Sequence, residues 1–233
     1  GNTTTYVYDA QGRMTSATDA MGATTSYEYT EAGKLVKITD AQGNVQTYTV
    51  DGNGFNTSQS DWMGNITTYA YDTQNNLTAV TDPLGNTTSY TYDAAGNLTV
   101  TTDANGNTTS YTYDGEGRVI SMTNAAGGTT TYNYDANGNL TGMTDAQGGT
   151  VTMTYNSVQQ QTAVTDARGG TTSYVYDGVG NTTKVTDALG KSTSYVYDAN
   201  GNLVSVTDRT GAKTEYTYDA NNRVTSVKDG NGN

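Results

Sequence analysis

Short runs of alternating apolar and polar residues recur along the chain with a fixed period of 21 residues. One unit contains the run TTSYTY at residues 87–92 and the run LTVTT at residues 98–102. β-Branched and aromatic residues in such short runs are typical of strands, and nothing between them predicts a helix. The pattern predicts two strands in each of eleven repeats, which form a single array over residues 1–233.

A D-x-x-G segment follows most of these runs and predicts a tight turn. In every unit one Asp position directly follows the tyrosine-containing run, and a second lies ten residues later. An Asp side chain can accept hydrogen bonds from the turn backbone, and Gly can take the left-handed conformation that closes the turn. We therefore predict hairpin loops at both positions. The predicted turn-capping residues are Asp9, Asp19, Asp93, Asp103, Asp135, Asp145, Gly96 and Gly106.

All 20 tyrosines lie one or three residues before the first Asp position, where only Val50 and Met153 replace them. Residues two apart in a strand share a face, so the tyrosines should form a stripe on one side of the sheet. Tyrosine combines a large apolar area with a hydroxyl that can be hydrogen-bonded, which suits a core. The predicted structural core contains Tyr6, Tyr8, Tyr90, Tyr92, Tyr111, Tyr113, Tyr132, Tyr134, Leu98 and Leu140.

The second strand of the unit has an irregular apolar spacing. Its Leu position, as in Leu98, and its Val position, as in Val80, lie three residues apart within the repeat. A regular strand would place them on opposite faces. A β-bulge would bring both onto the tyrosine face, and we expect one there.

Two all-β architectures fit a two-strand unit. In a β-solenoid, equivalent Asp side chains would stack about 5 Å apart, where like charges repel by roughly 1 kcal/mol. In a hairpin meander they lie about 10 Å apart, near the Debye length. The acidic turns therefore favour a long antiparallel meander sheet. Its twist predicts that the sheet curls into a spiral, tube or shell with the tyrosine face inside.

Charge and composition exclude several classes of function. A net charge of −12 disfavours nucleic acid and anionic membranes as partners. No stretch approaches the roughly 20 apolar residues of a membrane span, so we expect no membrane insertion. The chain has no Cys and no His, which excludes thiolate nucleophiles, His-containing triads and His-ligated metals.

The remaining candidate chemistry belongs to the carboxylates. Of the 23 acidic residues four are Glu, and the other 19, all Asp, occupy the two repeated turn positions. A catalytic site is normally a single exception within a fold, so we expect no enzymatic activity and no cofactor. Calcium could bind the acidic turns, but D-x-x-G-N lacks the alternating acidic ligands of calcium loops, and turn capping is the preferred interpretation.

The repeat resembles a known family. Residues 90–111, YTYDAAGNLTVTTDANGNTTSY, are similar to the YD repeat, also called the RHS repeat, and the resemblance covers the whole chain. It implies a β-sheet wall of stacked hairpins that forms a hollow shell around a C-terminal toxin, as in bacterial polymorphic toxins and insecticidal toxin complexes. Related repeats occur in bacterial wall-associated proteins and in teneurins. The longer signature that closes the shell and precedes self-cleavage is not found in this sequence.

We therefore expect a non-catalytic structural segment of a longer secreted or cell-surface bacterial protein. Two uses stay open: the resemblance implies a casing for a toxin, and the uniformity of the repeats favours an extracellular tube or fibre. The alternative is an adhesion module that binds glycans or protein partners through its Thr/Asn face. Self-association or continuation of the same array is expected at the strand edges.

Three departures from the repeat stand out. Trp62 and Phe55 occur in one unit, and the stretch 156–161 lacks the usual turn Asp and Gly. A contact with a partner could explain them, but drift within a repeat is the preferred interpretation.

Overall fold

A computed structural model describes residues 3–230, and these residues form 22 strands without a helix. Each repeat supplies an odd-numbered strand and an even-numbered one, and from β3 onward the odd-numbered strand is the longer. The strands are β1 (Thr5–Tyr8), β2 (Met14–Thr18), β3 (Thr24–Tyr29), β4 (Leu35–Thr39), β5 (Val45–Val50), β6 (Asn56–Ser60), β7 (Ile66–Tyr71), β8 (Leu77–Thr81), β9 (Thr87–Tyr92), β10 (Leu98–Thr102), β11 (Thr108–Tyr113), β12 (Val119–Thr123), β13 (Thr129–Tyr134), β14 (Leu140–Thr144), β15 (Thr150–Tyr155), β16 (Gln161–Thr165), β17 (Thr171–Tyr176), β18 (Thr182–Thr186), β19 (Ser192–Tyr197), β20 (Leu203–Thr207), β21 (Lys213–Tyr218) and β22 (Val224–Lys228).

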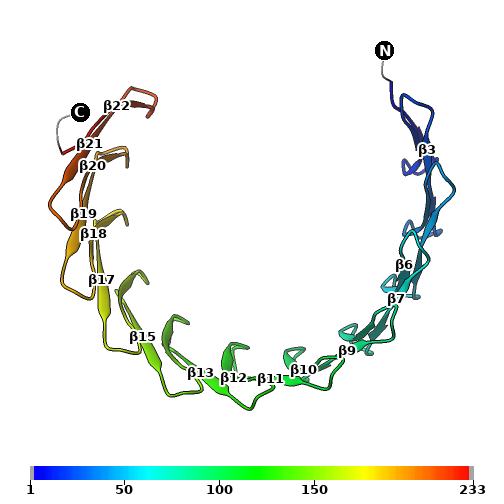
Figure 1. Ribbon diagram of the computed structural model, residues 1–233, viewed down its shortest axis with the longest axis horizontal. Helices are drawn as coiled ribbons and strands as arrows, with labels where there is room; N and C mark the ends of the chain where they lie inside the picture. The colour runs from blue at the N-terminus through cyan, green and yellow to red at the C-terminus, as the bar shows by residue number, and fades with distance from the viewer. Residues whose placement is uncertain (1–2, 231–233) are drawn as a thin grey trace. The chain divides into compact units, whose positions relative to one another are not determined.

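The strands form an antiparallel meander sheet, in which each strand pairs with its neighbours in the chain, and within each part of the chain the hairpins follow one another in chain order (Figure 1). The chain divides into two compact units, one up to Thr112 and one from Tyr113 onward. Within each unit, strands pair with their neighbours in sequence, as β8 pairs with β9 and β13 with β14. A solenoid would instead pair strands one repeat apart. The all-β meander prediction is therefore confirmed.

The predicted bulge is confirmed by the register of the hairpins. In the hairpin of β9 and β10, Tyr90 pairs with Thr101, but Tyr92 pairs with Leu98, so the register shifts between Leu98 and Val100. The same shift recurs in the hairpins of β13 with β14 and of β19 with β20. Directly paired residues share a face, so the Leu position and the Val position both lie beside tyrosines.

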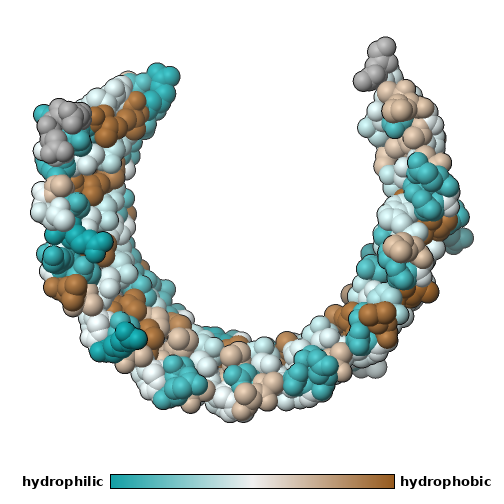
Figure 2. All heavy atoms as spheres, viewed as in Figure 1, coloured by the Kyte–Doolittle hydropathy of each residue, from teal (hydrophilic) through white to brown (hydrophobic). Residues whose placement is uncertain are grey.

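The tyrosine face is a half-buried layer rather than a closed core. Among the described residues no hydrophobic side chain is fully buried, because a single-layer sheet has nothing stacked over this face. Figure 2 shows small apolar patches separated by polar surface along each unit. In the described residues no pairing joins the first and last strands of either unit, so the predicted closure into a spiral, tube or shell stays a proposal.

Candidate functional site: the tyrosine face and the first-turn edge

Two kinds of turn form the two edges of the sheet. We call the turn after each odd-numbered strand, such as residues 93–97, the first turn, and the turn after each even-numbered strand, such as residues 103–107, the second turn. The rows of these turns are the first-turn edge and the second-turn edge. Both kinds follow the same D-x-x-G pattern, so any difference between the edges comes from the residues around the turn.

From Asp9 to Asp219, each Asp side chain accepts two hydrogen bonds from its own turn. Asp93 Oδ1 accepts from the backbone N–H groups of Ala95 and Asn97, both at 2.9 Å. In the second turn, Asp103 Oδ1 accepts from Asn105 at 2.9 Å and Asn107 at 2.8 Å. These bonds satisfy donors that the ladder leaves open at the hairpin tip.

The other predicted capping residues occupy the same geometry. Asp9, Asp19, Asp135 and Asp145 each accept from the N–H groups two and four residues later. Gly96 and Gly106 take φ angles of 86° and 83°, in the left-handed region that closes the turn. Three turns hold another residue there: Asn75, Gln159 and Asn222 also have positive φ angles.

A second side chain holds the other carboxylate oxygen. The Asn97 amide donates to Asp93 Oδ2 at 3.0 Å, and this bond, ahead of the backbone bond from the same residue, lowers the pKa of Asp93. Asn107 donates to Asp103 Oδ2 at 2.9 Å and likewise lowers the pKa of Asp103. The first of these pairs is partly buried, whereas the second is exposed.

The hydroxyl of the second tyrosine of a repeat links that repeat to the preceding one. Tyr92 donates to the backbone oxygen of Leu77 at 2.8 Å. The pairing of β8 with β9 ends at Ala79 and Ser89, two residues short of Leu77, so the hydroxyl supplies a donor where the ladder supplies none. We call this bond the tyrosine clasp. It recurs from Tyr29 to Met14, Tyr71 to Asn56, Tyr134 to Val119, Tyr155 to Leu140, Tyr176 to Gln161 and Tyr218 to Leu203.

The predicted core tyrosines are not equivalent. Tyr92 is half-buried, and burial is the main cause that raises the pKa of its hydroxyl. Tyr90, Tyr111, Tyr113, Tyr132, Tyr134, Leu98 and Leu140 are also half-buried. Tyr6 and Tyr8 are exposed, at 55% and 57%, because they lie on β1, which pairs only with β2 among the described strands.

The last residue of the first turn also reaches the next repeat. Arg118 binds Asp114 through Nε at 2.6 Å, and its guanidinium lies 4.8 Å from the centre of the Tyr134 ring. Arg13 stacks on Tyr29 in the same way at 5.0 Å. Phe55 occupies the equivalent position and packs on the Tyr71 ring with centroids 5.3 Å apart. A cation or an aromatic ring at this position therefore strengthens contact between repeats.

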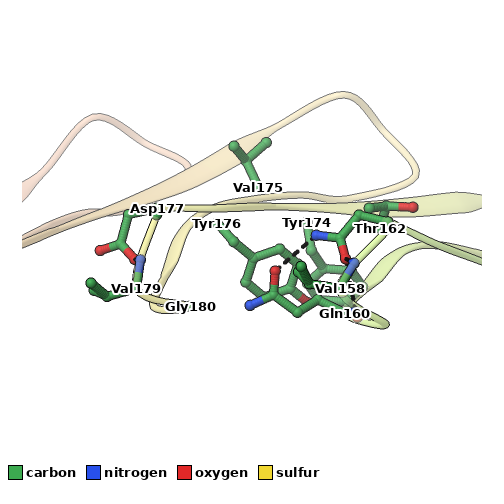
Figure 3. A pocket seen from close by; sticks show the side chains of 11 residues that line it. Val158, Gln160, Thr162, Tyr174, Val175, Tyr176, Asp177, Val179 and Gly180 are labelled. Atoms are coloured by element: carbon green, nitrogen blue, oxygen red, sulfur yellow. Dashed lines mark hydrogen bonds between the residues drawn. The ribbon is translucent and has the colours of Figure 1, made fainter.

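Shallow grooves lie between consecutive first turns. One, of about 640 Å³, is lined by Val158, Gln160, Tyr174, Tyr176 and Val179 among others. Figure 3 shows both tyrosine rings beside Val158 and Gln160, while Val175 points to the opposite face of β17. The turn beside this groove closes without Asp, because the Asn156 side chain accepts from Val158 and Gln160 in its place.

The described residues contain no cluster of three or more acidic side chains that could hold a metal ion. Residues 3–230 also include no helix long and apolar enough to cross a membrane. The arrangement of this edge is suited to holding repeats together and to presenting grooves.

Comparison with known families agrees with this geometry. The family described as Teneurin YD-shell matches residues 101–233, which is more than half of the chain. The chain belongs to this YD-shell family. The RHS Repeat family also matches, over residues 1–23, 8–45, 50–87 and 71–108, so the YD/RHS resemblance is confirmed. A comparison with curated proteins found no match.

Solved structures support the same fold. The structure titled "Crystal Structure of TcdB2-TccC3-Cdc42" is similar with a TM-score of 0.68 and 16% identity, and "Crystal Structure of TcdB2-TccC3-TEV" with a TM-score of 0.69 and 16% identity. Each similarity covers 97% of this chain but 15% of the other. The YD-shell chain therefore corresponds to a small part of much larger proteins.

Proposed function

We propose that this chain is a stretch of a non-catalytic wall in a large secreted or cell-surface protein, and that the complete wall encases a toxin. The tyrosine clasp carries the proposal, because a bond that recurs between most consecutive repeats suits a continuous sheet. Membership of the YD-shell family and the fold shared with TcdB2-TccC3 support a shell more than an extracellular tube or fibre. In such a shell the half-buried tyrosine face would point inward, where the curved wall and the enclosed toxin would shield it from solvent.

Electron cryomicroscopy of the full-length parent protein from its native source tests this proposal. A closed shell with protein density inside would support the toxin casing. An open, continuous tube with no cargo would replace the casing with the fibre. A compact protein in which these repeats bound a substrate would contradict the wall itself.

Adhesion to a protein partner is a second candidate, because apolar residues stand at second-turn tips. Met21, Met63, Leu84 and Leu189 are each at least 84% exposed there. Met63 and Leu84 lie on consecutive second turns, and neighbouring exposed apolar side chains can contact another protein surface. Surface plasmon resonance with cell-surface protein fractions, repeated with M63S and L84S together, would detect a loss of binding if these tips form the contact.

A further inference from the structure

The repeat built from β5 and β6 differs from its neighbours in how its two strands pair. β3 pairs four residues with β4, and β7 pairs four with β8. β5 pairs only three with β6, and the pair equivalent to Thr68 with Thr81 is missing. Its place is taken by the Ser60 side chain, whose Oγ accepts the Thr47 backbone N–H at 2.8 Å. The backbone ladder of this hairpin is therefore one residue pair shorter than those of the hairpins beside it.

The junction between β4 and β5 also lacks the tyrosine clasp. Val50 ends β5 at the position that Tyr71 holds in the next repeat, and it has no hydroxyl to donate. The junctions on both sides keep the clasp, from Tyr29 to Met14 and from Tyr71 to Asn56. The strand β5 is therefore joined to the preceding repeat less firmly than β3 and β7 are.

The first turn beside this junction is weaker as well. In the turn 30–34, Thr30 replaces Asp, and its Oγ1 accepts one backbone N–H, that of Lys34 at 3.1 Å, whereas the Asp side chains accept two. Arg13, one repeat before Lys34, binds the Asp of its own turn and stacks on the following tyrosine ring. Lys34 can do neither, because Thr30 has no carboxylate and Val50 has no ring.

The tyrosine face is more polar in this repeat than in the next. Gln59 pairs with Tyr48, and Asn56 pairs with Val50. The equivalent pairs of the hairpin of β7 and β8 are valine with tyrosine and leucine with tyrosine. Two amides and a valine in these places shield less apolar area from water, so less free energy opposes a local opening of β5.

Another junction lacks only one of these contacts. No clasp from Tyr197 is found in the part of the chain that the structure describes, but Tyr197 keeps its ring, and β19 pairs four residues with β20. At β5, in contrast, the missing clasp coincides with a shorter ladder, a weaker turn and a more polar face.

We propose that β5 is a hinge strand of the sheet. Its hydrogen bonds to β4 and β6 break and re-form while the clasped hairpins on both sides stay folded, so the sheet opens there first. Local opening begins where the least buried apolar area and the fewest stabilising contacts have to be lost. The proposal concerns the motion of the sheet itself, and it does not depend on whether the sheet encases a toxin.

Native-state hydrogen exchange of the 233-residue chain, followed at each amide by ¹H–¹⁵N NMR, tests this proposal. Protection factors in β5 and β6 should be at least about tenfold lower than in β2 and β3 on one side and in β7 and β8 on the other. The reason is that each lost hydrogen bond of about 1 kcal/mol changes the opening equilibrium about fivefold. Fraying from the end of the sheet would instead make protection rise steadily from β1 to β8, and that result would overturn the hinge.

Two substitutions of the same residue identify the cause. V50Y restores the ring and the hydroxyl of the clasp, whereas V50F restores the ring alone. V50Y should raise the protection of β4 and β5 about fivefold more than V50F does, the effect of one hydrogen bond of about 1 kcal/mol. L189A, at a distant and exposed second-turn tip, is the control and should leave these values unchanged. Equal protection in V50Y and V50F would overturn the proposal, because the missing clasp would then not be what loosens β5.

Discussion

The two edges of the sheet are built from the same turn, yet the recurring contacts between repeats, which are the tyrosine clasp and the ring contacts, lie at the first-turn edge. There, Tyr92 donates to Leu77, fifteen residues earlier, and Arg118 stacks on the following Tyr134. At the second-turn edge most side-chain bonds stay within a single turn, as between the hydroxyls of Thr81 and Thr87. The exceptions are scattered: Thr47 bonds Ser60 at 3.0 Å, and Arg209 lies 3.8 Å from Asp187 of the preceding second turn. The difference arises because a tyrosine directly precedes only the first Asp of each unit. The same hydrogen bonds therefore close the turns at both edges. The residue directly before the turn Asp decides whether that edge also contacts the neighbouring repeat.

The largest expected effect is the loss of the tyrosine clasp. Y92F keeps the ring and removes one donor, leaving the Leu77 oxygen without its bond in a half-buried place. We expect destabilisation of about 1.5 kcal/mol, measured by urea unfolding and by faster hydrogen exchange in β8 and β9.

Y90F is the matched control for this substitution. No side-chain hydrogen bond is found for the Tyr90 hydroxyl among the described residues, so its removal should change stability by less than about 0.5 kcal/mol. Equal effects of the two substitutions would show that the clasp does not couple the repeats.

A smaller, stabilising effect is expected at a first turn that lacks its glycine. Gln159 has a φ angle of 65°, where a side chain with a Cβ is strained. Q159G should stabilise the array by about 1 kcal/mol, because the left-handed conformation costs most residues about that much. N75G is the control and should gain only a few tenths, since Asn tolerates this conformation better. Thermal unfolding of both variants measures the difference, and a larger gain for N75G would refute this account of the strain.

The second-turn edge should respond less than the clasp to the loss of one bond. T81V removes the 2.8 Å hydroxyl contact with Thr87 but keeps a β-branched side chain suited to the strand. Because this pair is exposed, we expect a loss of about 0.5 kcal/mol at most by urea unfolding. A loss equal to that of Y92F would mean that the two edges hold the sheet equally, and the comparison would fail.

Much of this fold can be predicted from the sequence because the same strand and turn patterns recur in each repeat. The strands follow from runs such as TTSYTY, the turns from D-x-x-G, and the bulge from two apolar positions three residues apart. The preference for a meander followed from the spacing of like charges. These are local properties, or properties of one fixed period, and neither needs knowledge of the tertiary arrangement.

The clasp was not predicted, because its acceptor is defined only by where the ladder ends. Nothing in the residue type of Leu77 marks its backbone oxygen as free, since the signal is the register of β8 against β9. The sequence does contain a second signal of contact between repeats. Arg13, Phe55 and Arg118 share one repeat position, and each contacts the second tyrosine of the following repeat. The curvature of the sheet is harder to predict from the sequence than the clasp, because it depends on small angles between strands that residue types do not specify.

The smallest predicted effect separates the two edges by titration. The Asn97 amide lowers the pKa of Asp93, and the Asn107 amide lowers that of Asp103. A carboxyl whose pKa is lowered on folding stabilises the native state above its ordinary pKa of 3.8, and this contribution disappears as the pH falls through the lowered value. N97A and N107A should each raise the pKa of the Asp in the same turn, measured from the carboxyl carbon shifts in NMR. The change should be larger for N97A, because its bond is partly buried while that of Asn107 is exposed to water, which screens it. A larger pKa change in N107A would show that the Asp carboxylates of the first-turn edge are not better shielded from water than those of the second-turn edge. The closer contact between repeats at the first-turn edge would then be due to the tyrosines alone.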